Sequence, residues 1–425
     1  MKVAIKTLGC KVNQVESDIL ATTFSREGIK VVDFGEEADL YIINSCAVTK
    51  EAEHKTRQLV NRILRKNLAP QIILTGCYAQ LIAQEGENPF EKSVVLLPHF
   101  PKEKEIISLV GQWWGKNLSL AEYPLPSRTR AWLKIEDGCD HFCSYCLIPY
   151  LRGKVKSENP EKIIRQAQAL EEGGIREIVI CGVNLGYYGK ERGSKELINL
   201  LEELVNNTSL ARFRLSSLEP FLMDEEFIKR YFSLQDRVCP HFHLPLQSGS
   251  DRILKSMRRG YDTAYYRALV SRLHQYSPFV AISTDIIVGF PGEEKEDFEN
   301  TVNFIQEMGF SRMHVFSFSP RPGTPAFFWE KEKGVPPLEK KNREKILLEV
   351  ARENQKKYHR LFLGKKLKVL VESVHEGRGS GYSENYIPVK FRGKSKVGEI
   401  VEVIIEKEEN DFLEGKLLNY KNVNF

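Results

Sequence analysis

The stretch GCDHFCSYC, at Gly138–Cys146, places three cysteines at the spacing C-x3-C-x2-C directly after a strand-like run, Trp132–Glu136. Three thiolates on one short loop suit a four-iron cluster, whose fourth iron is then left without a protein ligand. A structural zinc ion is the alternative, but zinc takes four ligands in closed tetrahedral geometry, usually from C-x2-C pairs. His141 could be the fourth ligand, yet its place inside the loop makes simultaneous coordination awkward. The loop therefore predicts an iron–sulfur cluster with one open iron, a place to bind and activate a small molecule.

The composition is that of an ordinary globular chain. Its 425 residues predict two to four domains, with 42% hydrophobic and 28% charged residues. Met1–Lys6 runs straight into a strand-like pattern, and no run of about 18 apolar residues exists, so we expect a cytoplasmic protein with no membrane partner. In a reducing cytosol, the eight cysteines favour metal binding or catalysis over disulfides. The net charge of +5 is a weak indication of a polyanionic partner. No coiled-coil or obvious interface stretch is present, and we expect a monomer.

The first part of the chain alternates strand and helix patterns, which is typical of a doubly wound parallel-sheet domain. Three of its apolar runs end on a small residue and then a cysteine. The runs are Val3–Thr7, Leu40–Asn44 and Ile72–Thr75, and the cysteines are Cys10, Cys46 and Cys77. Because the carboxyl ends of parallel strands share one sheet edge, the three thiols can meet there. A buried small hydrophobe is the alternative for any one cysteine. For all three together we favour a shared metal site, a second four-iron cluster.

The central part predicts an open, partial (β/α)6 barrel. Six apolar runs alternate with helical patterns such as Pro160–Glu172. The runs are Ala131–Glu136, Glu177–Cys181, Arg212–Ser216, His241–Leu246, Ala281–Gly289 and Met313–Phe318. Carboxyl ends of barrel strands build active sites. Polar residues fall at these ends, and we interpret them as cofactor contacts: Asn184, Ser217, Glu219, Gln247 and Asp285. His243, inside a strand run, is read as a satisfied core histidine.

The last part predicts a small β-barrel. One long charged helix over Glu339–Phe362 precedes a switch to period-two patterns, with four or five short strands. The loop Lys390–Lys396 carries cations around one aromatic residue and is a candidate for phosphate contacts. The predicted divisions are residues 1–115, a linker at 116–128, a central domain at 129–362 and the small barrel at 363–425.

The cluster loop, with an aromatic residue before its last cysteine, resembles the signature of the radical S-adenosylmethionine enzymes. The resemblance implies that S-adenosylmethionine binds the open iron and is cleaved to a 5′-deoxyadenosyl radical, with Tyr145 against the adenine. Five further motifs resemble the methylthiotransferases within that superfamily, and the small barrel is similar to their TRAM domain. They are Thr7–Gln14, Asn44–Cys46, Thr75–Cys77, Leu244–Ser250 and Gly289–Glu293. Cys10–Gln14 and Pro240–Pro245 resemble most the branch that acts on threonylcarbamoyladenosine.

The resemblance implies transfer of a methylthio group to C2 of N6-threonylcarbamoyladenosine beside the anticodon of tRNA. It implies two 4Fe–4S clusters, one on Cys139, Cys143 and Cys146 and one on Cys10, Cys46 and Cys77, together with S-adenosylmethionine and a reducing electron donor. The same chemistry on isopentenyladenosine in tRNA, or on a ribosomal-protein aspartate, is the alternative. A non-enzymatic iron–sulfur or zinc protein that binds RNA through the barrel is a third.

Overall fold

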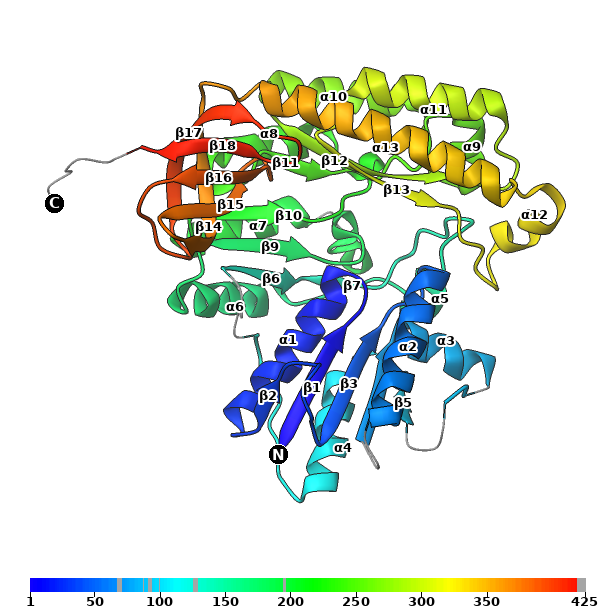
Figure 1. The fold of residues 1–425 in the computed structure, drawn as a ribbon, viewed down its shortest axis with the longest axis vertical. Coiled ribbons are helices and arrows are strands. Elements are labelled where there is room, and N and C mark those ends of the chain that lie inside the picture. Colours follow the sequence, from blue (N-terminus) through cyan, green and yellow to red (C-terminus); the bar gives the residue numbers. More distant parts are fainter. Residues whose placement is uncertain are drawn as a thin grey trace, which may run out of the picture.

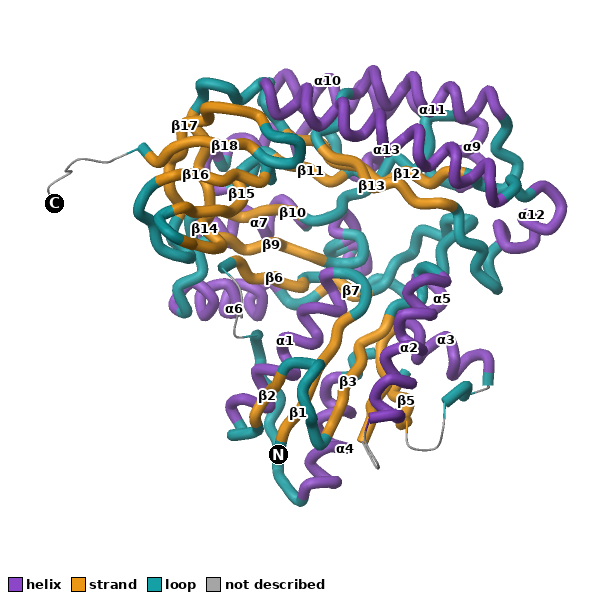
Figure 2. Tube along the Cα trace, in the orientation of Figure 1, coloured by secondary structure: helices purple, strands orange, loops and turns teal. Residues whose placement is uncertain are grey.

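The computed structural model describes residues 1–66, 71–86, 88–90, 94–98, 100–124, 129–193 and 196–418. Three parts follow one another along the chain (Figures 1 and 2). An N-terminal α/β domain stands below a half-open barrel of parallel strands, and a small closed barrel sits at one end of the half-open one.

The N-terminal domain is a five-stranded sheet in the order β2-β1-β3-β4-β5, parallel throughout. Its strands are β1 (Lys2–Thr7), β2 (Lys30–Val32), β3 (Leu40–Ser45), β4 (Gln71–Gly76) and β5 (Val94–Leu97). Its helices are α1 (Lys11–Arg26), α2 (Lys50–Lys66), α3 (Cys77–Glu85) and α4 (Glu103–Trp114).

Alternation along the strands fills two apolar layers, one on each face of this sheet. Ile42 packs with Phe24 of α1 and Ile106 of α4, whereas Ile43 packs with Val60 of α2 and Ile82 of α3. The doubly wound prediction is therefore confirmed. Thr49 caps the start of α2, because its Oγ1 accepts a hydrogen bond from the Ala52 amide at 3.2 Å.

The central part is built from two three-stranded parallel sheets, β6-β9-β10 and β11-β12-β13. Their strands are β6 (Arg130–Lys134), β9 (Glu177–Cys181), β10 (Arg212–Leu215), β11 (His241–His243), β12 (Ala281–Val288) and β13 (Arg312–Ser317). A parallel bridge between Ser217 and His243 joins the two sheets, so the six strands form the predicted partial barrel.

Helices cover the outside of this half-barrel (Figure 1). They are α6 (Pro160–Glu172), α7 (Leu197–Asn207), α8 (Glu225–Ser233), α9 (Asp251–Met257), α10 (Thr263–Tyr276), α11 (Lys295–Met308), α12 (Pro325–Lys333) and α13 (Pro337–Arg360). Smaller pieces are α5 (Ile148–Arg152), β7 (Glu136–Asp137), β8 (Lys156–Ser157) and the 3-10 turns Leu185–Tyr187, Lys190–Arg192, Pro220–Leu222 and Gln235–Arg237. The predicted helix Pro160–Glu172 is reproduced with both ends, because Asn159 caps it and Pro160 fits its first turn.

The C-terminal part is a closed barrel in the order β14-β15-β16-β18-β17. Its strands are β14 (Lys366–His375), β15 (Arg378–Ser383), β16 (Pro388–Arg392), β17 (Ile400–Glu408) and β18 (Leu413–Leu417). The five strands agree with the predicted four or five, although the sequence RGSGYS of β15 carries no apolar alternation. Gly381 is required there, since a Cβ at this position would lie 1.8 Å from the Leu370 carbonyl oxygen.

A buried ion network fixes this small barrel to the amino-terminal ends of the central strands. Glu177 of β9 is fully buried, and the Nε atoms of Arg212 and Arg214 lie 2.7 and 2.9 Å from its carboxylate oxygens. The other guanidinium nitrogens of both arginines donate to backbone carbonyls of Lys368 and of 382–384 in the small barrel. One carboxylate thus orients both arginines that join the two parts.

Glu177→Ala is expected to destabilise the protein by about 3–5 kcal/mol, because it leaves buried guanidinium groups without an anion. Urea unfolding measures the change, and the small barrel should exchange its amide hydrogens faster. Glu172→Ala, at an exposed carboxylate nearby in sequence, is the matched control. Equal stability of the two variants would contradict this role of the network.

Candidate active site at the junction of two cysteine triads

The strands β1, β3 and β4 are neighbours in the sheet, and their carboxyl ends are in register. Thr7 pairs with Asn44, and Ser45 pairs with Gly76, so Cys10, Cys46 and Cys77 follow at one edge. Burial raises the pKa of Cys46 to about 12, and the nearby thiols of Cys77 and Cys10 act in the same direction. The structure thus brings the three predicted N-terminal cysteines together.

A glycine in the left-handed region precedes Cys139, as one precedes Cys77. Gly138 has a φ of +82°, and a Cβ there would lie 2.2 Å from the Lys154 carbonyl oxygen. The Cys139 amide donates to the Gly153 carbonyl at 3.0 Å, which folds the loop back on itself. Burial raises the pKa of the Cys146 thiol, and the nearby thiols of Cys143 and Cys139 raise this pKa further. The three thiols of this loop are therefore close neighbours.

In three of the six cysteines, the thiol accepts a backbone N–H from two residues further along. The pairs are Val48 to Cys46 at 3.5 Å, His141 to Cys139 at 3.4 Å and Ile148 to Cys146 at 3.4 Å. Such N–H···S contacts stabilise negative charge on sulfur and tune iron–sulfur clusters. The same local geometry in both triads fits thiolates that hold metal.

His141 is already engaged with the protein. Its Nε2 lies 2.8 Å from the Arg258 carbonyl oxygen, and its Nδ1 lies 3.5 Å from the Tyr187 hydroxyl. Both ring nitrogens therefore have partners other than a metal, which disfavours the zinc alternative. Three thiolates remain as the donor set of the loop, and they fit a four-iron cluster with an open iron.

Arg259 contacts Cys143, the central cysteine of the 139–146 loop, and this contact was not predicted from the sequence. Its side chain is buried, with Nη1 3.1 Å from Cys143 Sγ and an ion pair to Glu219. Burial raises the pKa of Cys143, but His141 and Arg259 outweigh it, so the net pKa is below its usual value. The sequence Met257–Gly260 is an ordinary helix end and gave no signal of this contact.

Arg259→Gln is expected to lower the rate of S-adenosylmethionine cleavage by about 10–100-fold, because groups that contact a metal ligand typically have effects of this size. Cleavage is followed by 5′-deoxyadenosine formation under reducing conditions. Arg258→Gln changes the exposed neighbour and is the control. The idea fails if both variants cleave S-adenosylmethionine at the wild-type rate.

Polar atoms without partners lie at the strand ends where cofactor contacts were predicted. Among the described residues, Asn184 Oδ1, Ser216 Oγ and Glu136 Oε1 are buried and accept or donate no hydrogen bond within the protein. Burial holds the pKa of Glu136 well above its usual value, and its other oxygen accepts from the Asn184 amide at 2.9 Å. Unsatisfied buried groups of this kind fit a polar ligand. Glu136 was not predicted.

The remaining predicted contacts lie around the same end of the barrel. Ser217 bridges to His243, and Glu219 is held by Arg259. Gln247 has a φ of +72°, a strained conformation for a residue with a side chain and one found at functional sites. Asp285 accepts hydrogen bonds from two histidines and is described further below.

A cavity of about 230 Å³ is lined by Cys146 and by Val48, which lies two residues after Cys46. One wall comes from the loop just after Cys46 and the other from the Cys146 loop, with barrel residues closing the rest. The lining is Val48, Thr49, Tyr145, Cys146, Leu147, Gln247, Asp285, Ile287 and 316–319. A group that enters this cavity thus touches segments attached to both sets of cysteines.

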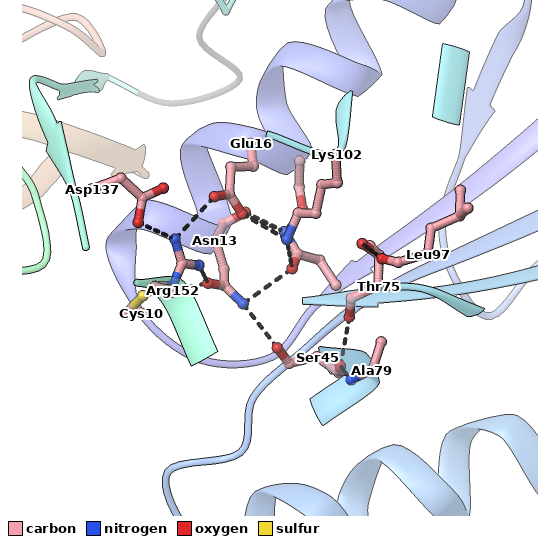
Figure 3. Close-up of polar contacts among 12 residues, drawn as sticks. Cys10, Asn13, Glu16, Ser45, Thr75, Ala79, Leu97, Lys102, Asp137 and Arg152 are labelled. Atoms are coloured by element: carbon pink, nitrogen blue, oxygen red, sulfur yellow. Dashed lines mark hydrogen bonds and ion pairs between the residues drawn. The ribbon is translucent and has the colours of Figure 1, made fainter. Parts of the chain in front are cut away.

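A buried charge network joins the N-terminal domain to the central part (Figure 3). Glu16 of α1 lies 2.8 Å from Lys102 Nζ and 3.2 Å from Nη1 of Arg152, which belongs to α5 of the central part. Arg152 also lies 2.5 Å from Asn13 Oδ1 and 2.7 Å from Asp137 Oδ1. Its Nε has no partner and is buried. Both cationic side chains are 0% exposed, so the network fixes how the triads face each other.

Known sequence families match three successive parts of the chain. Residues 2–97 match the uncharacterized protein family UPF0004, residues 133–305 the radical SAM superfamily and residues 360–418 the TRAM domain. The threonylcarbamoyladenosine tRNA methylthiotransferase MtaB of Thermotoga maritima is 40% identical, covering 98% of each chain. The chain belongs to the radical S-adenosylmethionine methylthiotransferase family. It is an enzyme of the radical S-adenosylmethionine type.

Other family members place the chain within the MtaB branch. MtaB of Aquifex aeolicus is 37% identical over 95% of this chain and all of its own length. A tRNA-2-methylthio-N(6)-dimethylallyladenosine synthase of Dictyoglomus thermophilum is 34% identical, covering 98% of each chain. In fold, the chain is similar to the radical S-adenosylmethionine methyltransferase TsrM of Kitasatospora setae, at 15% identity, a TM-score of 0.52 and 77% coverage of each chain. No helix in the described residues is long and apolar enough to cross a membrane.

Proposed function

We propose that this enzyme transfers a methylthio group to C2 of N6-threonylcarbamoyladenosine next to the anticodon of tRNA. The observation that carries the proposal is the cavity lined by Cys146 and Val48, because its walls come from both cysteine-bearing loops. The MtaB relatives, named for this substrate, support the choice of nucleoside. The cytoplasm, as the site of tRNA, is the proposed location, and the enzyme is proposed to act as a monomer.

Two 4Fe–4S clusters fit the donor sets, one on Cys139, Cys143 and Cys146 and one on Cys10, Cys46 and Cys77. With S-adenosylmethionine and electrons from a reducing partner, they supply the radical and sulfur chemistry that an unactivated C–H bond requires. The unsatisfied Asn184 and Glu136 oxygens, with Ser217, Glu219, Gln247 and Asp285, would bind and orient S-adenosylmethionine. Tyr145 lines the cavity and would lie against its adenine.

The chain's own residues then do two things for the target base. Apolar side chains such as Leu147, Ile287 and Phe318 exclude water from the cavity. The Glu16 network holds the N-terminal domain against the central part. A target base must leave its stack to enter a space of this kind, which suits a single-stranded loop of RNA.

The small barrel is the proposed contact to tRNA. The segment 390–396, predicted as a loop, is the end of β16 and the turn after it. It presents exposed cations, although Lys390 Nζ lies 4.0 Å from the Phe412 ring centroid and Arg392 pairs with Glu406. Lys394→Ala with Lys396→Ala is expected to weaken tRNA binding and to lower the slope of log K against log salt by about one to two. S-adenosylmethionine cleavage should persist. Lys341→Ala with Lys345→Ala on α13 is the control, and a salt slope that matches this control would contradict the contact.

The test of the proposed function is mass spectrometry of nucleosides, or of the peptide, after reaction of the reconstituted enzyme with a defined substrate. Three substrates are compared: tRNA with threonylcarbamoyladenosine, tRNA with isopentenyladenosine and a ribosomal-protein segment with its aspartate. The 2-methylthio product should form from the first. Product from either of the other two alone would assign the chain a different substrate within the same chemistry.

A further inference from the structure

A chain of hydrogen bonds crosses the second sheet of the half-barrel from its open edge inward. Strand register sets Asp285 of β12 beside His314 of β13, whose Nδ1 lies 3.0 Å from Asp285 Oδ1. On the other side, His243 Nε2 lies 3.2 Å from Asp285 Oδ2. His243 Nδ1 is 3.0 Å from Ser283 Oγ, which is 3.2 Å from His241 Nε2. Five side chains on three adjacent strands therefore form one connected network.

The positions of the protons follow from one end of this network. Burial would raise the pKa of Asp285, but the two histidines outweigh it, so the carboxyl is ionised and only accepts. Both histidines must then donate to it. The distances fit a Ser283 hydroxyl that donates to His243 Nδ1 and accepts from His241 Nε2, with the Phe242 carbonyl oxygen, at 3.4 Å, as a second acceptor for the same hydroxyl. Among the described residues, His241 Nδ1 is buried and has no hydrogen-bond partner.

At the outer end, the Nδ1 contact to Asp285 orients the His314 ring, and Nε2 has no hydrogen-bond partner among the described residues. In the tautomer that donates from Nδ1, Nε2 is an acceptor. The His314 side chain is 44% exposed, and Phe316, two residues further on the same face of β13, is 45% exposed. The strand β13 is at the edge of its sheet in the described residues. Asp285 and Phe316 line the cavity that also contains Cys146. His314 does not line this cavity itself, but it contacts two residues that do: Asp285 through a hydrogen bond, and Phe316 with ring centroids 6.4 Å apart.

We propose that His314, held by Asp285, recognises the polar group on N6 of the target adenosine. Nε2 accepts a hydrogen bond from a hydroxyl or amide N–H of that group, and Phe316 offers a stacking face to the base. The inference rests on the proposed function and extends it, because it names the side chains that read the nucleoside. A site built to pair with such a donor disfavours an analogue that lacks it, such as an apolar isopentenyl group.

The alternative interpretation of these side chains is that they bind a divalent cation. Ligand atoms of His243, Asp285 and His314 all lie within 4.8 Å of one another, a spacing that could hold a metal ion. However, both oxygens of Asp285 and both ring nitrogens of His243 already have hydrogen-bond partners. Asp285 and His243 are therefore satisfied as they stand, which favours recognition through hydrogen bonds.

The test uses the full-length, reconstituted enzyme and two anticodon stem-loops that differ only at N6 of the target adenosine. One carries threonylcarbamoyl and the other isopentenyl, and fluorescence anisotropy gives both affinities. The wild type should prefer the first RNA. His314→Phe should reduce this preference by about tenfold, as expected for the loss of one hydrogen bond. His314→Gln, which keeps an acceptor, should restore part of it. His274→Gln, an exposed histidine on the outer helix α10, should change nothing.

The other outcomes overturn the inference. If His314→Phe lowers the affinity for both RNAs equally, His314 makes a contact that does not depend on the group at N6. If neither affinity changes, His314 does not contact the RNA. If the preference disappears after a brief EDTA treatment and returns when Zn²⁺ is added, a bound metal ion recognises the group at N6. Formation of the methylthio product by the wild type is measured separately, so a lost preference and a failed proposed function are distinguishable.

Discussion

Cys46→Ala is expected to keep S-adenosylmethionine cleavage and to lose the methylthio product, whereas Cys139→Ala is expected to lose both. The reason is the separation of the two triads. Cys139 lies on the loop after β6 that carries the radical signature, while Cys46 follows β3 of another domain. Removing one of three thiolates should empty one site and leave the other folded.

The two products of this experiment are 5′-deoxyadenosine, measured by chromatography, and the methylthio nucleoside, measured by mass spectrometry. Cys239→Ala is the matched control, since Cys239 is a buried thiol outside both triads. Full methylthio transfer by Cys46→Ala would contradict a role of the N-terminal triad in sulfur delivery. Loss of cleavage in the same variant would show that the two sites are not independent.

A large effect on stability is expected at Glu16. Glu16→Gln leaves Lys102 buried without its anion and Arg152 with Asp137 alone, and we expect a loss of about 3–5 kcal/mol in the free energy of unfolding. Urea unfolding followed by tryptophan fluorescence measures it. Glu37→Gln, at an exposed carboxylate of the same domain, is the control.

The effect should also depend on pH, in a direction that the structure fixes. Burial would raise the pKa of Glu16, but Lys102 and Arg152 outweigh it, so the folded-state pKa lies well below the unfolded value. A group of this kind stabilises the fold above its unfolded pKa of about 4.3, and this stabilisation is lost as pH falls. The difference between wild type and Glu16→Gln should therefore be largest near neutral pH and shrink below about pH 4. A difference that grows on acidification would contradict the assignment.

The sequence predicted features that repeat or that follow a period. Three strands that each end in a cysteine could be placed at one sheet edge, because parallel register leaves no other choice. The long helix was predicted at Glu339–Phe362 and runs over Pro337–Arg360, since its apolar stripe and flanking prolines define it. The short strands β2 and β5 were missed, because three or four residues carry too little pattern.

Contacts between single side chains from distant parts of the chain could not be predicted from the sequence. Arg259 reaches Cys143 from a helix end, and Arg152 enters the N-terminal domain from α5. His243 was predicted as a satisfied core histidine, and it is indeed hydrogen-bonded at both ring nitrogens, but to Asp285 and Ser283 in a network that extends to the exposed His314. Each contact joins residues far apart in the chain, and no local motif encodes it.

The most direct test of the central claim is the iron and acid-labile sulfide content after anaerobic reconstitution. It is measured on the wild type and on the variant with Cys139, Cys143 and Cys146 all changed to alanine. Two four-iron clusters predict about eight irons in the wild type and about four in the variant. About four irons that fall to none would contradict the account, because the N-terminal triad would then hold no cluster.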